Sequence, residues 1–120
     1  MYIYVTARKC PVNAYYFISL GEYVILDGDH EISLVECQYS HQNLRTYICC
    51  DLVESSFIHD SKWNILRAIK PQQQSIFFSH YIKLKELKFN TIKLWIMDDN
   101  GTLIDYKRNF GCTLHIRKIK

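Results

Sequence analysis

Five cysteines and five histidines are the residues of this chain with the widest chemical repertoire. A structural zinc site needs paired ligands at short spacing, about two to four residues apart. Cys49 and Cys50 are adjacent, so on a strand their side chains point to opposite faces and cannot easily share an ion. Cys37 and His41 have a workable spacing, but no second pair accompanies them. Buried thiols that pack as small hydrophobic groups are therefore expected, and neither a metal nor another cofactor is predicted.

Nucleophilic catalysis would need a cysteine or serine held by a general base and an orienting group. His80, His115 and Asp51 could serve as partners, but no nucleophile elbow or comparable motif frames any of them. The neighbouring carboxylates, at 98–99 and at 27 and 29, fall at expected turns, where aspartate bonds the nearby backbone. The glycines are isolated and form no phosphate-binding loop. These residues predict a protein that is not an enzyme.

Basic residues are concentrated in the last third of the chain. Residues 1–80 carry six Lys and Arg against eight Asp and Glu, whereas residues 81–120 carry nine against four. One interpretation is solvated strand faces with an edge guarded by lysines. The other is a surface for nucleic acid or another acidic partner, because aromatic residues interleave with the basic ones. The residues of such a surface would be Tyr81, Lys83, Lys85, Lys93, Trp95 and Arg117.

Alternating apolar residues predict the strands that would position these side chains. One strand is expected over 91–97, with Ile92, Leu94 and Ile96 on one face. Another is expected over 112–118, where Cys112, Leu114 and Ile116 point inward and His115 points to the opposite face. Residues 54–62 are expected to be irregular. Further strands are expected over 2–6, 13–20, 23–26, 31–39, 45–53, 63–69, 75–84 and 102–106.

Turn dipeptides separate the expected strands. Asp27-Gly28 and Asn100-Gly101 supply the positive φ that tight turns require. No stretch predicts a helix of convincing length, and short strands at intervals of about 8–12 residues are typical of an antiparallel sandwich. The hydrophobic share of 48% is ample for a core. We expect residues 1–120 to form a single all-β domain, an antiparallel β-sandwich of the jelly-roll kind.

The cysteine number also bears on the compartment. Five cysteines at spacings that match no disulfide framework, without an apolar leader at the N-terminus, predict free thiols in a reducing compartment. No apolar run approaches the length of a membrane span. A soluble intracellular protein is therefore expected.

Three stretches, in this order along the chain, resemble one known family. The first is LDGDHEISLVECQYSH (26–41). The second combines TYICCDLVE (46–54) with WNILRAI (63–69). The third runs from SHY (79–81) through FNTI (89–92) and DDNG (98–101) to LHIR (114–117). Together they are similar to the penton-type minor capsid protein of Polinton (Maverick) elements and the related adintoviruses. The form is shortened, because only residues 42–45 join the first two stretches.

The resemblance implies a single jelly-roll capsid protein, with five copies at each five-fold vertex of an icosahedral shell. Its partners would be copies of itself and the major capsid protein, in a virion assembled inside the host cell. A closed ring of heterologous contacts would suffice for this role, and aromatic residues suit such contacts. The residues predicted to form interfaces are Tyr15, Tyr16, Tyr47, Trp95, His115 and Arg117. The alternative is a β-sandwich module that binds nucleic acid or a host protein through a basic C-terminal sheet.

Overall fold

The computed structural model describes residues 1–7, 14–37, 39, 43–58, 60–71, 80–106 and 110–120. These residues form strands, turns and irregular segments, and none of them lies in a helix. A helix able to cross a membrane is accordingly absent from the described residues. The strands are β1 (Tyr2–Ala7), β2 (Tyr16–Ile25), β3 (His30–Cys37), β4 (Thr46–Cys50), β5 (Ser56–Ile58), β6 (Ser61–Trp63), β7 (Ile65–Ile69), β8 (Ile82–Lys83), β9 (Lys88–Asp98) and β10 (Phe110–Lys118).

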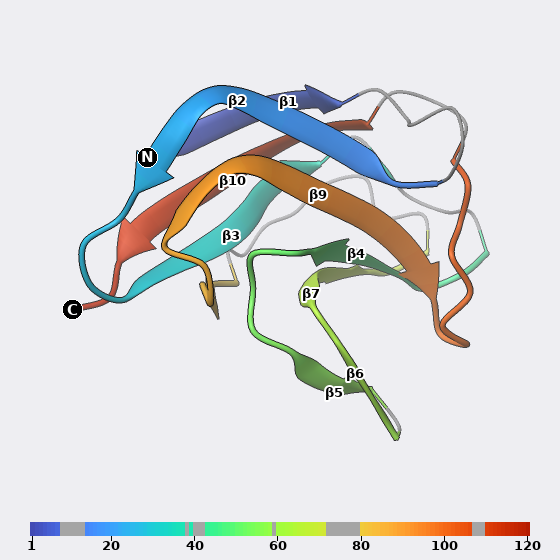
Figure 1. The fold of residues 1–120 in the computed structure, drawn as a ribbon. Coiled ribbons are helices and arrows are strands. Elements are labelled where there is room, and N and C mark those ends of the chain that lie inside the picture. The colour runs from blue at the N-terminus through green and yellow to red at the C-terminus, as the bar shows by residue number, and fades with distance from the viewer. Residues whose placement is uncertain (8–13, 38, 40–42, 59, 72–79, 107–109) are drawn as a thin grey trace.

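Two four-stranded antiparallel sheets make up the body of the molecule (Figure 1). Their strand orders are β1-β10-β3-β8 and β2-β9-β4-β7, while β5 and β6 form a separate two-stranded hairpin. The pairing is nested: β1 pairs with β10, β2 with β9, β3 with β8 and β4 with β7. A long antiparallel ribbon folded over into two sheets has this pairing, and it defines a jelly roll. The predicted all-β, jelly-roll-like sandwich is therefore confirmed.

Side chains from both sheets fill one hydrophobic core. On β9, Ile92, Leu94 and Ile96 are at most 1% exposed, and Leu114 and Ile116 of β10 are buried in the same way, as the alternation predicts. Each such side chain contributes about 1.5–3 kcal/mol through its burial. The short strand β4 is buried at all five positions, so other residues cover its outer face as well.

The expected turn after β9 is confirmed in detail. The backbone N–H groups of Asn100 and Thr102 both donate to Asp98 Oδ1, at 2.9 and 3.0 Å. Gly101 has a φ of 78°, and its N–H donates to the Asp98 carbonyl. The prediction of a returning strand over 102–106 is wrong, however. Leu103 forms only an isolated bridge with Met97, so these residues form no continuous strand along β9.

Four other expectations need correction. β2 runs unbroken through Gly21, whose φ of 78° lies within an irregular part of the register. Residues 54–62, expected to be irregular, contain β5 and begin β6, a local hairpin that lacks the alternation of a core strand. The strand expected over 63–69 is divided at Asn64, whose side chain donates to the Val53 carbonyl at 2.9 Å. Of the strand expected over 75–84, only Ile82–Lys83 is observed, and residues 75–79 lie outside the described residues.

Candidate interaction surfaces

The two long C-terminal strands lie in opposite sheets. β9 belongs to the sheet with β2, whereas β10 belongs to the sheet with β1. Lys88 and Lys93 are therefore on one side of the sandwich, and Arg117 and Lys118 are on the other. The expectation that the basic C-terminal residues share one sheet is therefore wrong. Period-two alternation does not show which sheet a strand joins, because pairing partners are distant in sequence.

Polar and aromatic side chains form a connected row across the outer face of the β1-β10-β3-β8 sheet. His115 stacks against Tyr2 with ring centroids 4.3 Å apart, and its Nδ1 lies 2.7 Å from the Tyr81 hydroxyl. Arg117 Cζ lies 3.5 Å from the centroid of the Tyr81 ring. Arg117 Nε also donates to Glu31 Oε1 at 2.7 Å. The structure thus brings the predicted interface residues His115 and Arg117 into one row.

The electrostatics of this row favour an uncharged His115 beside the charged pair of Arg117 and Glu31. Burial lowers the pKa of His115, and the positive charges of the N-terminal amine and Arg117 lower it further. An uncharged imidazole at neutral pH can hold its hydrogen bond to Tyr81. Arg117 is partly exposed, so its ion pair with Glu31 mainly orients the guanidinium over the Tyr81 ring. The row can therefore offer stacked rings and a fixed cation to a partner.

A second group lies on the sheet that contains β9. Tyr15 and Trp95 meet edge to face, with centroids 5.8 Å apart, and both are half-buried. Lys93 Nζ lies 4.3 Å from the Tyr15 ring centroid and 5.4 Å from that of Trp95. The predicted interface residues Tyr15, which directly precedes β2, and Trp95 of β9 are therefore neighbours, away from His115 and Arg117 of the other sheet.

Tyr16 and Tyr47 do not lie on an exposed surface, so their prediction as exposed interface aromatics is wrong. Tyr16 is 1% exposed and packs against Phe110, with centroids 5.5 Å apart, and burial raises its pKa to about 12. Tyr47 is 7% exposed; its hydroxyl donates to Asp99 Oδ1 at 2.6 Å, and its ring meets Trp63 edge to face. β2 and β4, which contain these two tyrosines, carry large side chains on both faces. Alternation alone therefore does not show which face points to the core.

The most exposed apolar side chains were not singled out by the sequence. Phe17, Tyr23 and Ile25 of β2 are 53%, 59% and 72% exposed, and Phe57 of β5 is 73% exposed. Tyr4 of β1 is exposed in the same way. No local motif marks them, and Phe and Ile are residue types that are more often buried in a core. Their exposure is what makes them candidates for contacts with other molecules.

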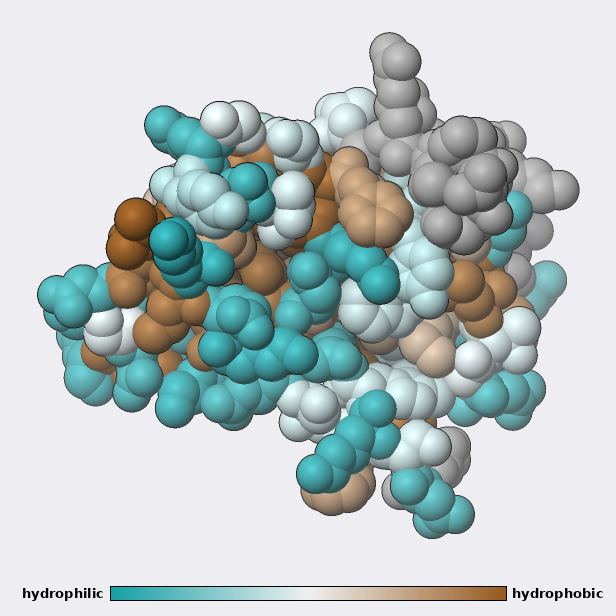
Figure 2. Space-filling model, viewed as in Figure 1, coloured by the Kyte–Doolittle hydropathy of each residue, from teal (hydrophilic) through white to brown (hydrophobic). Residues whose placement is uncertain are grey.

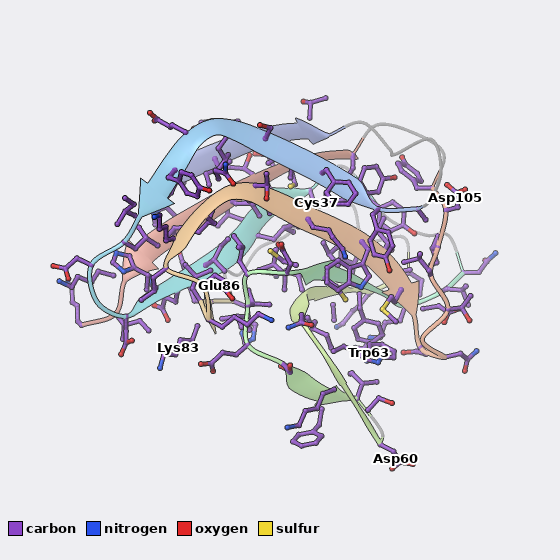
Figure 3. All side chains as sticks on the ribbon, in the orientation of Figure 1. Cys37, Asp60, Trp63, Lys83, Glu86 and Asp105 are labelled. Atoms are coloured by element: carbon purple, nitrogen blue, oxygen red, sulfur yellow. The ribbon has the colours of Figure 1, made fainter. Side chains whose placement is uncertain are left out.

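The β5–β6 hairpin projects below the sandwich in Figure 1, and in the chain it lies between β4 and β7. Asp60 lies at its tip and Trp63 at its base (Figure 3). Figure 2 shows it as a separate lobe beneath the larger body. Lys62 Nζ lies 5.1 Å from the Phe57 ring centroid. A groove of about 220 Å³ separates the hairpin from β7; its lining includes Tyr47, Phe57, Ile58, Ile65 and Ala68.

The jelly-roll assignment rests on the strand pairings of this chain. Each of the four nested pairs is antiparallel and hydrogen-bonded. The pairings of β10 with β3 and of β9 with β4 join the nested pairs into two sheets. No family model, no curated protein and no solved structure matches this chain.

The described cysteines are thiols packed in the interior. Cys49, Cys50 and Cys112 are buried, and Cys37 is half-buried, as expected for thiols that act as small hydrophobic groups. Burial raises the pKa of Cys37 to about 11, that of Cys49 and Cys50 to about 12, and that of Cys112 as well. Within the described part of the chain, no group of three or more metal-ligating side chains gathers. Cys10 and His41 lie outside the described residues.

Asp51 and His80, two candidate partners of a catalytic nucleophile, have separate surroundings. Asp51 Oδ1 accepts the backbone N–H of Lys93 at 3.0 Å, which ties the turn after β4 to β9. His80 is exposed and lines the groove beside the hairpin. The observed role of the Asp51 carboxylate is thus structural.

Proposed function

We propose that this chain is a structural component of a virion, a penton-like minor capsid protein that assembles with copies of itself at icosahedral vertices. The strand order carries the proposal, because eight strands in two sheets with nested antiparallel pairing are the architecture of viral capsid jelly rolls, among other proteins. Fold alone does not determine function, so a second support is needed.

The second support is the position of the three family-like stretches in the fold. The first contains β3, the second contains β4 and β7, and the third contains the start of β9 and part of β10. The three stretches therefore lie on strands that pair with one another, β3 with β10 in one sheet and β4 with β7 in the other. A shared pattern on paired strands is what a common jelly-roll framework would require.

Size-exclusion chromatography with light scattering, over a wide range of protein concentration, tests the proposal. We expect a closed ring of the 14.3 kDa chain, with five-fold symmetry in electron-microscopy class averages. Addition of a five-fold ring to shells of the major capsid protein should fill the vertices. A chain that stays monomeric at high concentration, alone and with those shells, would overturn the proposal.

A further inference from the structure

The guanidinium of Arg67, on β7, has a nitrogen for which the described fold supplies no acceptor. Arg67 Nη1 is buried, and no described residue accepts a hydrogen bond from it. The side chain forms no ion pair with a described residue either. It is half-buried, and this burial lowers the pKa of Arg67. A buried polar group without a partner is costly, so a ligand that accepts from this guanidinium would stabilise the protein.

Arg67 borders the groove between the β5–β6 hairpin and β7, here called the hairpin groove. The register of β4 with β7 places Arg67 opposite Ile48, a core residue, so its side chain leaves β7 on the face turned toward the other sheet. Ile82 of β8, in that other sheet, lines the same groove. Arg67 therefore faces a space that the hairpin and both sheets border.

The walls of the hairpin groove indicate the class of ligand. Many of them are apolar side chains, among them Phe57 and Ile65. Arg67 supplies the fixed charge, and no carboxylate is among the described lining residues. The acidic residues in and just before the hairpin, Glu54 and Asp60, are exposed and neither lines the groove. A cation in apolar surroundings, without a carboxylate of its own, fits an anion that carries a hydrocarbon group.

The size of the groove narrows the choice further. Its volume of about 220 Å³ is below the roughly 300–1,000 Å³ of sites for drug-sized ligands. A guanidinium binds carboxylate and phosphate through the same fork of donors, but apolar walls disfavour the higher charge of a phosphate. A carboxylate on a branched chain of about six carbon atoms matches both the volume and the charge.

We infer that the hairpin groove binds a small free carboxylic acid with a branched hydrocarbon chain, its carboxylate on the Arg67 guanidinium and its hydrocarbon against Phe57 and Ile65. This inference goes beyond the proposed function, because it needs neither a ring nor a shell. The carboxylate accepts from the N–H groups that the described fold leaves without an acceptor. The hydrocarbon covers part of the Phe57 side chain, which is 73% exposed in the free protein.

Isothermal titration calorimetry of the parent chain with isocaproate, a branched six-carbon acid, tests the site. The matched ligand is isocaproamide, which has the same carbon skeleton and no charge. The acid should bind at least about tenfold more tightly than the amide, because its carboxylate accepts from a charged group. Acetate, which lacks the hydrocarbon, should bind more weakly than isocaproate. Methyl resonances of Ile58, Ile65 and Ala68, which line the groove, should shift on binding of isocaproate.

Variants separate the roles of charge and wall. Arg67→Met should weaken isocaproate binding at least about tenfold. It should not lower the urea midpoint, because the parent guanidinium has no described partner to lose. Phe57→Ala should also weaken binding, and should keep the fold because Phe57 is exposed. Arg117→Met is the matched control, since Arg117 pairs with Glu31 in the other sheet and its variant should bind as the parent chain does.

Several results would overturn the inference. They are no binding of isocaproate at millimolar concentration, equal binding of acid and amide, and unchanged binding to Arg67→Met. An acetylated, amidated peptide with one glutamate among valines distinguishes the acidic side chain of a protein partner from a free acid. If this peptide binds and isocaproate does not, the groove docks a protein and the inference is wrong.

Light scattering on the same samples keeps this inference distinct from the proposed function. A monomeric parent chain that binds isocaproate would contradict the ring and retain the site. A ring that does not bind isocaproate would contradict the site alone.

Discussion

The hydroxyl of Tyr47 ties the centre of one sheet to the turn at its end. It donates to Asp99 Oδ1 at 2.6 Å, and burial together with this bond raises the pKa of Tyr47. Tyr47→Phe removes the bond and leaves the packing of the ring on Trp63, so we expect a loss of about 1–2 kcal/mol in the free energy of unfolding by urea. The control is Tyr23→Phe, an exposed tyrosine, which should change stability by less than about 0.5 kcal/mol. Equal effects of the two variants would contradict this role.

The buried thiols predict a loss of stability at alkaline pH. Burial raises the pKa of Cys49 and Cys50 from 9.0 in the unfolded chain to about 12 in the folded protein. Above pH 9 the unfolded state loses these protons first, so the stability that is present below pH 9 falls as pH rises towards 12. Each thiol adds a slope on the order of 1 kcal/mol per pH unit.

Urea titrations at pH 8, 9, 10 and 11 measure this fall. A chain with Cys49→Ala and Cys50→Ala should be less stable at pH 8, because two buried side chains are shortened. Its further loss between pH 9 and 11 should nevertheless be smaller than that of the parent chain. An identical pH dependence would show that these thiols do not titrate differently on unfolding.

At the scale of the strand and turn, Gly21 and Gly101 offer a matched pair. Both have a φ of 78°, which costs an alanine about 1–2 kcal/mol. A Cβ at Gly21 would meet nothing within 4 Å, whereas at Gly101 it would lie 3.1 Å from Trp63 Cζ2. Gly101→Ala should therefore cost about 1 kcal/mol more than Gly21→Ala in urea unfolding, and should also shift tryptophan fluorescence. Equal costs would place the whole penalty in the backbone.

Individual strands were predictable where one face is apolar and the other polar. β9 and β10 alternate in this way, and the residues expected to point inward are buried. The turn at 98–101 was predictable because Asn-Gly permits positive φ. β2 was expected to break at Gly21, but the pairing with β9 continues on both sides of it. That continuity depends on a distant strand, which local sequence does not contain.

The interaction surfaces were less predictable for the same reason. The prediction that His115 points to the face opposite Leu114 and Ile116 is confirmed, since both of those neighbours are buried. The abundance of tyrosine at interfaces favours a surface position for Tyr16 and Tyr47, yet the second sheet covers Tyr16 and Trp63 packs on Tyr47. The projecting hairpin was missed, because three-residue strands that pair only with each other show no core-facing alternation.

At the scale of the whole molecule, the first and last strands are hydrogen-bonded, but their loss should not be equivalent. β10 lies between β1 and β3 and buries Phe110, Leu114 and Ile116. β1 is an edge strand, and Val5 is its buried residue among those described. A chain that ends at residue 109 should therefore lack a cooperative urea transition and the circular dichroism of a β-sandwich, because a central strand and its core side chains are gone.

Deletion of residues 1–7 should instead leave a folded protein with a lower urea midpoint, since one edge ladder and about 1.5–3 kcal/mol from Val5 are lost. Far-ultraviolet circular dichroism and tryptophan fluorescence during urea unfolding measure both chains, and Trp63 and Trp95 lie in or beside the sheet that neither deletion removes. The two chains differ because of the nested pairing. The sheet with β2, β9, β4 and β7 keeps all its strands in both chains, but only the chain without residues 1–7 retains β10 to cover that sheet. A cooperative transition in the chain that ends at residue 109 would mean that this sheet folds without β10.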